Sequence, residues 1–240
     1  MIKRIKDLVR ENRRNQKEII NYSRELYWAN RYHDSIRGHN KIENLPLNIG
    51  GWAGSYTLFY VLNRILLDFR PEKILELGLG ESTKFISEFT KTKLNSSLHQ
   101  VIEHDENWLR KFSKEYDISK NTNIELCSLE NIQFKGFKTT VYGKLKEKIA
   151  KKYDFYLIDG PIGTLRYSRS DMIGLVDNIQ PGDEFIMLID DYGRPGEKET
   201  VEKLKDKLKR RNIKFSYKTY MGLKQVIVIG TNKFRVILNL

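Results

Sequence analysis

The spacing of apolar residues after residue 70 predicts strands that alternate with helices. Five short runs are almost continuously apolar, which is typical of buried strands: 73–78, 98–105, 123–129, 153–160 and 184–191. Between them, apolar residues return every three or four positions among charged ones, which indicates helices with one buried face. Two final apolar runs lie too close together for a helical crossover and are expected to be antiparallel, at 214–220 and 224–231.

Continuous apolar strands separated by helices predict a parallel sheet that is covered on both faces. The expected fold class is therefore α/β, with a Rossmann-like, doubly wound sheet of seven strands that is mostly parallel and has an antiparallel final strand. After the third strand, residues 142–152 are expected to form a basic helix.

Residues 1–69 are expected to form an N-terminal helical or lid segment, and residues 70–240 the ligand-binding domain. Helical spacing predicts one helix over residues 1–30 and another that stops at Pro71. Glycine, asparagine, proline and aromatic residues between these helices indicate an irregular segment. The first helix either packs on the core, which is the simplest case, or lies on a membrane surface, or pairs with a second copy in a homodimer.

Composition narrows the class of protein. The 240 residues are 40% apolar, which suffices for one globular core, and no apolar run is long enough for a membrane span. The basic N-terminus is not followed by an apolar stretch, so it does not resemble a secretory signal. Cys127 is the only cysteine, which excludes a disulfide framework and a thiolate metal cluster and fits a cytoplasmic location.

The formal net charge of +12 allows two interpretations. A basic surface attracts nucleic acid, acidic lipid or an anionic substrate. Most basic residues, however, are interleaved with acidic ones, as in the helix predicted within 197–212. That pattern favours solvated helix faces over a dedicated polyanion site.

Two glycines, Gly78 and Gly80, stand where the first predicted strand runs into a helix. In doubly wound sheets, ligands bind beyond the carboxyl ends of the strands, and glycine lets the backbone approach a ligand closely. Glu103, at the end of the second strand, comes about two dozen residues later, the spacing at which a carboxylate accepts both ribose hydroxyls. The sequence therefore predicts a site for an adenosine-containing ligand.

The residues around the glycine turn favour one adenosine ligand over another. A dinucleotide fingerprint has a third small residue at position 83, where this chain has Thr83, and it leaves the helix N-terminus bare for a pyrophosphate. Here Glu76 ends the strand and Glu81 lies in the turn, and two carboxylates repel a pyrophosphate. They suit a ligand with an ammonium group, which favours S-adenosylmethionine over NAD.

With these residues the chain resembles the class I S-adenosylmethionine-dependent methyltransferases, and within them a bacterial group related to small-molecule and saccharide O-methyltransferases. The resemblance covers roughly residues 70–230 and lies in four segments, at 74–83, 101–105, 153–161 and 185–197. It implies the strand order three, two, one, four, five, seven, six. It also implies a set of cofactor-binding residues: Glu76, Gly78, Gly80, Ser82, Glu103, His104, Asp105, Ser128, Leu129 and Asp159.

Three carboxylates are expected at one rim of the sheet, because Asp159 ends the fourth strand and Asp190 and Asp191 end the fifth. The cluster resembles that of metal-dependent catechol-type O-methyltransferases, which implies a site for a divalent cation such as Mg²⁺. Alternatively, the aspartates cap helices or form a salt bridge with Arg194. The catalytic candidates are Asp159 and Asp190, with His104 a weaker candidate for orienting or deprotonating a hydroxyl.

Four further residues are candidates for contacts with the substrate. Arg166 and Arg169 follow the fourth strand and could bind an anionic group bidentately, or lie in a solvated loop. Trp52 and Tyr56 could form a wall of the substrate pocket, or pack in the core.

The predicted function is S-adenosylmethionine-dependent O-methylation of a small polar acceptor such as a sugar or glycan intermediate. Three alternatives stay open: a nucleic-acid methyltransferase, an NAD-dependent enzyme, and a non-catalytic protein that binds an adenosyl ligand. The nucleic-acid alternative is disfavoured because the Asn/Asp-Pro-Pro-aromatic run that stacks a flipped base is missing after the fourth strand.

Overall fold

The computed structural model describes residues 2–150 and 152–240. Seven strands of this part form one sheet, in which β9 is antiparallel to both of its neighbours and the other pairings are parallel. In spatial order they are β3 (Thr122–Leu126), β2 (Leu98–Glu103), β1 (Lys73–Leu77), β6 (Phe155–Ile158), β7 (Ile186–Ile189), β9 (Gln225–Gly230) and β8 (Ser216–Met221). The predicted α/β, Rossmann-like sheet and its strand order are confirmed.

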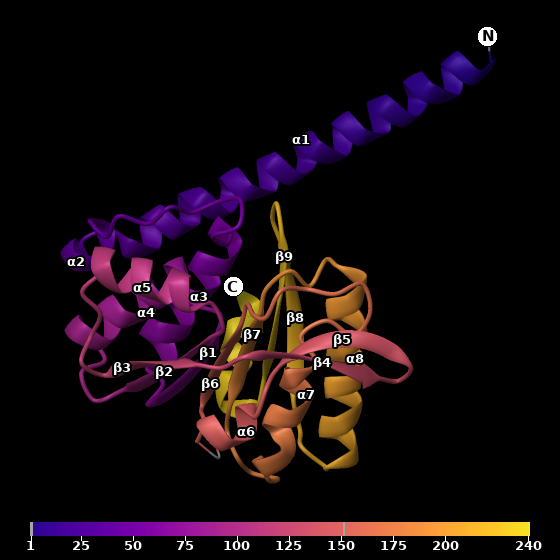
Figure 1. Ribbon diagram of the computed structural model, residues 1–240. Helices are drawn as coiled ribbons and strands as arrows, with labels where there is room; N and C mark the ends of the chain where they lie inside the picture. Colours follow the sequence, from indigo (N-terminus) through magenta and orange to yellow (C-terminus); the bar gives the residue numbers. More distant parts are fainter. Residues whose placement is uncertain (1, 151) are drawn as a thin grey trace.

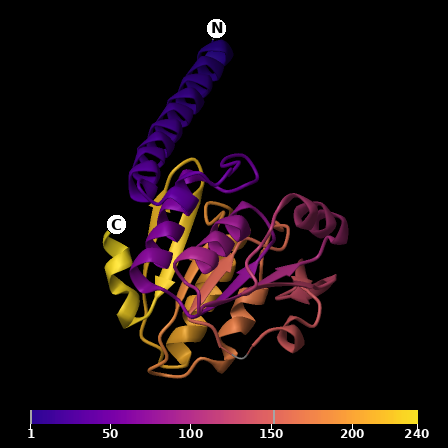
Figure 2. The same cartoon turned by 90° about the vertical axis from the view of Figure 1, so that its left-hand side faces the viewer.

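Helices cover both faces of this sheet (Figures 1 and 2). One face packs against α3 (Tyr56–Phe69), α4 (Glu81–Thr92), α5 (Glu106–Glu115) and the 3₁₀ helix η2 (Asn232–Asn239). The other face packs against α6 (Leu145–Lys148), α7 (Asp171–Leu175), the 3₁₀ helix η1 (Val176–Asn178) and α8 (Pro195–Arg210). Side chains along each strand point alternately to the two faces of the sheet. Ile74 faces α3, and Leu75 faces the side of α8.

The N-terminal helix α1 (Ile2–Ile36) is longer than predicted and projects beyond the rest of the molecule (Figure 1). Only its C-terminal part reaches the core, through Trp28, Tyr32 and Ile36, which pack with α3. The short α2 (Asn40–Glu43) follows. Because α3 lies in the same hydrophobic cluster as Ile74 of β1, the segment before residue 70 shares its core with the sheet.

The prediction of a basic helix over residues 142–152 is largely wrong. Only the four residues of α6 are helical there, Tyr142 ends a strand, and Lys151 lies outside the described residues. Before this segment, the chain forms a hairpin that was not predicted, of β4 (Leu129–Phe134) and β5 (Phe137–Tyr142). Its turn residues Lys135 and Gly136 both have positive φ, of 52° and 82°, which is the two-residue turn that matches strand twist.

None of the helices in residues 2–150 and 152–240 is both long and apolar enough to cross a membrane.

Candidate functional site

A cavity of about 570 Å³ lies at the carboxyl edge of β1, β2 and β6. Its lining comes from the loops that leave these strands, including Gly78, Gly80, Glu103 and Asp159. Strand-end loops meet there because the strands are parallel and end at one edge of the sheet. The size of the cavity is that of a small-molecule site.

The glycine turn is shaped by a close approach of two loops. Gly78 has φ +103°, and a Cβ built on it would lie 3.2 Å from the carbonyl carbon and oxygen of Asp159. A side chain at position 78 would therefore push the β1 and β6 exit loops apart. Gly80 is extended and meets no atom within 4 Å of such a Cβ, so its surface is open. Its backbone N–H donates to Thr83 Oγ1 at 3.1 Å, which fixes the start of α4.

Glu76 supports this turn from below and does not line the cavity. Its side chain is fully buried, accepts a hydrogen bond from the Ser82 hydroxyl, and lies 2.9 Å from His99 Nε2. Ser82 itself does line the cavity. The direct cofactor contact predicted for Glu76 is not supported by this position, because both of its carboxylate oxygens are engaged within the protein.

Glu103 is the carboxylate that is held in the cavity wall. Its Oε1 accepts the backbone N–H groups of His104 and Asp105 at 2.6 and 2.7 Å. Its Oε2 accepts one described hydrogen bond, from the N–H of Leu79 in the glycine turn, at 3.0 Å. Since a carboxylate oxygen takes two hydrogen bonds, Oε2 keeps acceptor capacity for a ligand hydroxyl. The interaction with Leu79 also couples the position of the glycine turn to Glu103.

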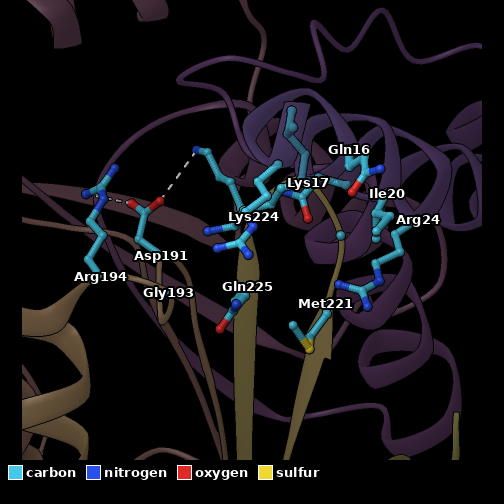
Figure 3. Close-up of a pocket in the computed structure, with 14 residues that line it drawn as sticks. Gln16, Lys17, Ile20, Arg24, Asp191, Gly193, Arg194, Met221, Lys224 and Gln225 are labelled. Carbon is cyan, nitrogen blue, oxygen red and sulfur yellow. Dashed lines mark ion pairs between the residues drawn. The ribbon is translucent and has the colours of Figure 1, made fainter. Parts of the chain in front are cut away.

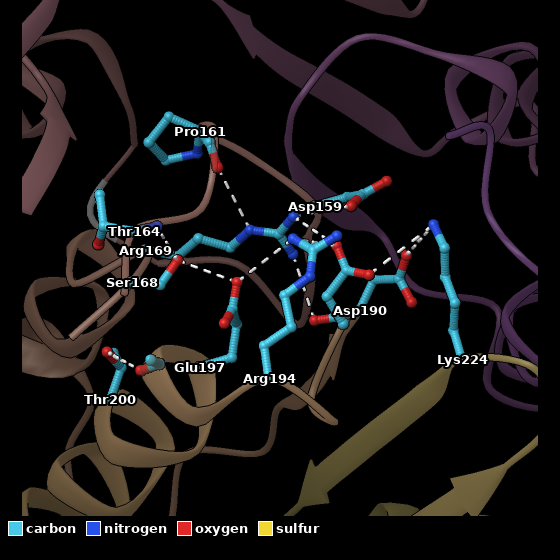
Figure 4. Close-up of polar contacts among 12 residues, drawn as sticks. Asp159, Pro161, Thr164, Ser168, Arg169, Asp190, Arg194, Glu197, Thr200 and Lys224 are labelled. Atoms are coloured by element: carbon cyan, nitrogen blue, oxygen red, sulfur yellow. Dashed lines mark hydrogen bonds and ion pairs between the residues drawn. The ribbon is translucent and has the colours of Figure 1, made fainter. Parts of the chain in front are cut away.

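The three predicted aspartates do come together: oxygens of Asp159, Asp190 and Asp191 lie within 4.8 Å of one another. Three cationic side chains converge on them, Arg169, Arg194 and Lys224 (Figure 4). Arg169 Nη2 lies 3.2 Å from Asp159 Oδ1 and 3.0 Å from Asp191 Oδ2. A guanidinium therefore already bridges two of the three carboxylates.

This bridge bears on the predicted Mg²⁺ site. Oxygen ligands suit such a cation, but a metal that joined Asp159 to Asp191 would lie against the positive charge of Arg169. Arg169 is itself only 4% exposed and is held by the backbone carbonyls of Pro161 and Asp190 as well. The residues present do not fit a bound metal with Arg169 where it stands, so the divalent cation is not supported.

Burial and neighbouring carboxylates raise the pKa of two of the aspartates. Burial, and then the nearby Asp190 carboxylate, raise the pKa of Asp159 to about 7 against the attraction of Arg169. Burial and then Asp191 raise the pKa of Asp190, whose two oxygens accept no hydrogen bond from any described residue. Lys224 Nζ is 3.7 Å from Asp190 Oδ2. Asp159, which lines the cavity, can thus exchange a proton near neutral pH.

We expect Asp159→Asn to gain stability relative to the wild type as the pH rises from about 5 to about 8. The folded-state pKa of Asp159, raised to about 7, lies above the ordinary value of a carboxyl group in an unfolded chain. The wild type therefore loses stability as the pH rises toward about 7, because its carboxyl group has to ionise in a partly buried place beside Asp190. The amide of the variant has no proton to lose in this range.

Melting temperatures of both proteins across this pH range measure the difference. Asp206→Asn, on the exposed side of α8, is the control, and its stability should follow that of the wild type at every pH. A difference between Asp159→Asn and the wild type that stays constant or shrinks as the pH rises would mean that the ion pair with Arg169 outweighs burial.

The other predicted site residues divide into two groups. Trp52, His104 and Arg169 line the cavity, Trp52 with an almost fully exposed side chain. Five residues do not line it: Tyr56, Asp105, Arg166, Ser128 and Leu129. Tyr56 begins α3 and packs against α1, and Arg166 pairs with Glu199 at 2.6 Å. The structure therefore does not support the substrate contacts predicted for these two.

Residues 128 and 129 are drawn away from the cavity by the unpredicted hairpin. The carbonyl of Ser128 accepts the N–H of Gly143, and Leu129 begins β4. Their place in the cavity wall is taken by Tyr142, the last residue of β5. Burial raises the pKa of Tyr142 well above its usual value, so its hydroxyl stays protonated and can donate a hydrogen bond. The only turn signal for this hairpin in the sequence is Gly136 after Lys135, and it is weak because the flanking segments alternate poorly.

Comparisons with known proteins give a likeness in structure only. No family model matches the sequence, and a search of curated proteins finds no relative. An O-methyltransferase from Bacillus cereus in complex with S-adenosylhomocysteine (SAH) is similar over 89% of this chain and 99% of that one, with a TM-score of 0.52 and 11% identity. The SAH-bound methyltransferase PaMTH1 of Podospora anserina is similar over 92% of this chain and 95% of that one, with a TM-score of 0.50 and 13% identity.

At such identities a likeness carries the fold and not the activity. Both likenesses extend over nearly the whole chain. The chain therefore has the Rossmann-like fold of the class I S-adenosylmethionine-dependent methyltransferases.

Proposed function

We propose that the protein transfers a methyl group from S-adenosylmethionine to an oxygen atom of a small polar acceptor. The observation that carries the proposal is the joint position of the glycine turn and Glu103 in one cavity, where Glu103 Oε2 bonds the N–H of Leu79. The two similar structures, both solved with SAH, support the same ligand.

The residues of the cavity fit an adenosyl ligand with an ammonium group better than a dinucleotide. Glu103 would accept hydrogen bonds from the ribose hydroxyls. Glu81 also lines the cavity, at the first turn of α4, where a pyrophosphate would otherwise bind. The Glu81 carboxylate is paired with Lys84, so the negative charge that this wall presents to a ligand comes from Glu103. That charge attracts a cationic ligand and repels phosphate groups, which disfavours the NAD alternative.

Methyl transfer to oxygen requires that the acceptor hydroxyl is held in position and loses its proton. The cofactor, when bound, supplies an electrophilic methyl group. Asp159 lines the cavity and has a pKa raised to about 7, so it can accept the proton of an acceptor hydroxyl near neutral pH. Arg169 holds Asp159 in place, and Tyr142, which also lines the cavity, can donate a hydrogen bond. Positioning of this kind supplies much of the rate of a single displacement.

Calorimetric titration with SAH, and then with NAD⁺, tests the cofactor assignment. We expect SAH to bind and NAD⁺ not to bind. If NAD⁺ binds and SAH does not, the methyltransferase proposal is contradicted. If neither ligand binds, the protein does not use an adenosyl ligand.

Added Mg²⁺ or a chelator is expected to leave SAH affinity unchanged, within about twofold. The reason is that Arg169 bridges Asp159 and Asp191 and Arg194 also pairs with Asp191, so these carboxylates do not need a metal. The same titration, repeated with millimolar Mg²⁺ and with EDTA, measures the effect. A clear gain in affinity with Mg²⁺ would restore the metal site and require Arg169 to move.

The acceptor is proposed to be a saccharide or glycan intermediate, on the resemblance of the sequence to saccharide O-methyltransferases. The cavity suits a polar acceptor because Asp159, Arg169 and Lys224 all line it. A nucleic-acid acceptor is less well supported, since Pro161 is followed by Ile162 and not by the second proline and aromatic residue that stack a flipped base.

A homodimer through α1 is also proposed. Apolar side chains that are each more than half exposed recur along one side of this helix at the spacing of a coiled coil: Ile5, Leu8, Ile19, Tyr22 and Leu26. Asn12 and Asn15 stand at the same positions in the middle of this stripe, and an asparagine in such a seam specifies register and oligomer state at a cost in stability. The stripe lies opposite Trp28, by which α1 contacts the core.

Ile19→Ser is expected to weaken this dimer by at least about tenfold, because two apolar side chains are lost from one symmetric interface. Light scattering at a series of protein concentrations measures the dissociation. Leu98→Ser, which alters an equally exposed apolar side chain on β2, is the control and should leave the dimer intact. A wild type that stays monomeric at every concentration would refute the dimer.

A further inference from the structure

A second hollow, of about 630 Å³, adjoins the cofactor cavity on the side of α1. One wall is the face of α1 that carries Arg13, Lys17 and Arg24, and the other is formed by the β8–β9 turn and the loop after β7 (Figure 3). We call it the α1 groove. Its volume is that of a small-molecule site.

The α1 groove is fixed by hydrogen bonds between its walls. Glu25 of α1 accepts the N–H of Leu223 in the β8–β9 turn at 2.8 Å and the N–H of Tyr56 at 2.6 Å. Trp28 Nε1 donates to the carbonyl of Met221 at 2.9 Å. Because the helix and the turn are tied together at the inner end, the groove is a built feature of the fold.

Positive charge dominates the lining of the α1 groove. Five cationic side chains line it, and Asp191, the one acidic residue among its lining, already contacts Arg169 and Arg194. Arg13, Lys17 and Arg24 form no ion pair with any residue that the structure describes. Like charges gathered in a hollow repel one another, and a bound anion relieves that repulsion.

The α1 groove is continuous with the cofactor cavity. Asp191, Arg194 and Lys224 line both hollows. A ligand held by its anionic end in the groove would therefore extend past Lys224 toward Asp159, where the acceptor hydroxyl is expected. A substrate site must connect with the cofactor cavity, so that the acceptor can reach the methyl group. A basic surface with only a structural role would not need this connection.

We propose that the α1 groove binds a phosphate or diphosphate group of the methyl acceptor, with Arg13, Lys17 and Arg24 as its ligands. The part that concerns the acceptor rests on the proposed methyl transfer. Arginine binds phosphate oxygens through two parallel hydrogen bonds, and several cations together select a multiply charged group over a single carboxylate. The acceptor class is thus a phosphorylated polar molecule, such as a sugar phosphate or a diphosphate-linked sugar.

Calorimetric titration with inorganic pyrophosphate tests the anion site in the full chain. We expect the variant Arg13→Gln, Lys17→Gln, Arg24→Gln to bind pyrophosphate at least about tenfold more weakly than the wild type, because charge-assisted hydrogen bonds are lost. The matched control is Lys3→Gln, Lys6→Gln, Arg10→Gln, which removes the same charge from α1 outside the groove. The control should bind within about twofold of the wild type.

The outcomes separate this inference from the proposed function. SAH binding is measured in the same proteins and is expected to be equal in all three. If SAH binds and pyrophosphate does not, or if both triple variants lose pyrophosphate alike, the groove site is overturned and the methyltransferase proposal stands. If pyrophosphate binding depends on the groove residues and SAH does not bind, the anion site is supported and the methyltransferase proposal fails. A single-stranded oligonucleotide that displaces pyrophosphate and binds more tightly at physiological salt would overturn the small acceptor.

Discussion

Replacing Glu103 by Gln is expected to weaken SAH binding by about 2–3 kcal/mol, or roughly 30- to 150-fold. Glu103 Oε2 is the acceptor that keeps capacity for a ligand hydroxyl in the wall of the cavity. The amide keeps the size of the side chain and one acceptor oxygen, but it loses the negative charge that makes these hydrogen bonds strong. Calorimetric titration with SAH measures the loss directly.

Two controls make this result specific. Glu106→Gln alters a nearby exposed carboxylate that pairs with Arg110, and it should bind SAH as the wild type does. Melting temperature in the absence of ligand shows whether the loss of acceptors for the backbone N–H groups of His104 and Asp105 has loosened the fold. Unchanged SAH affinity in a folded Glu103→Gln protein would rule out the ribose contact.

Gly78→Ala is expected to lower the free energy of unfolding by about 2–4 kcal/mol and to abolish measurable SAH binding. Two causes add. A Cβ at position 78 would lie 3.2 Å from backbone atoms of Asp159 and Gly160, and the φ of +103° is one that L-residues rarely adopt. The β1 and β6 exit loops, which both line the cavity, would have to separate.

Gly80→Ala is the matched control in the same turn. Its backbone is extended, with φ −172°, and a Cβ there meets nothing within 4 Å. Chemical denaturation of the two variants should show a large loss of stability for Gly78→Ala and almost none for Gly80→Ala. Equal losses would mean that the approach of the two loops is not what the glycine at position 78 permits.

The course of the main chain was largely predictable from the pattern of apolar residues. Buried parallel strands such as Ile186–Ile189 need apolar residues on both faces, so they stand out from the amphipathic helices around them. The hairpin of β4 and β5 was missed because its side chains are half-exposed and alternate weakly, and such strands carry a faint signal. Because the hairpin was missed, Tyr142 was not among the predicted site residues.

The candidate site was predictable only where a sequence motif lies at the end of a buried strand. Gly78, Glu103 and Asp159 each lie at or just beyond the end of a buried strand, and all three line the cavity. Lys224 was not predicted, because it reaches the aspartates from the β8–β9 turn, far away in sequence. Glu76 shows the converse: its position at a strand end gave no hint that His99, on the next strand, and Ser82 engage its carboxylate.

The sequence by itself determined the α/β class, the order of the seven sheet strands along the chain, and the glycine turn with its acidic partner. These depend on local periodicity and on short spacings, which neighbouring residues fix. Only the tertiary structure decided that Arg169 bridges Asp159 and Asp191, and that α1 and the β8–β9 turn enclose a basic groove beside the cofactor cavity. Both depend on side chains from segments that are far apart in sequence and come together only when the chain folds. No local sequence pattern predicts such contacts.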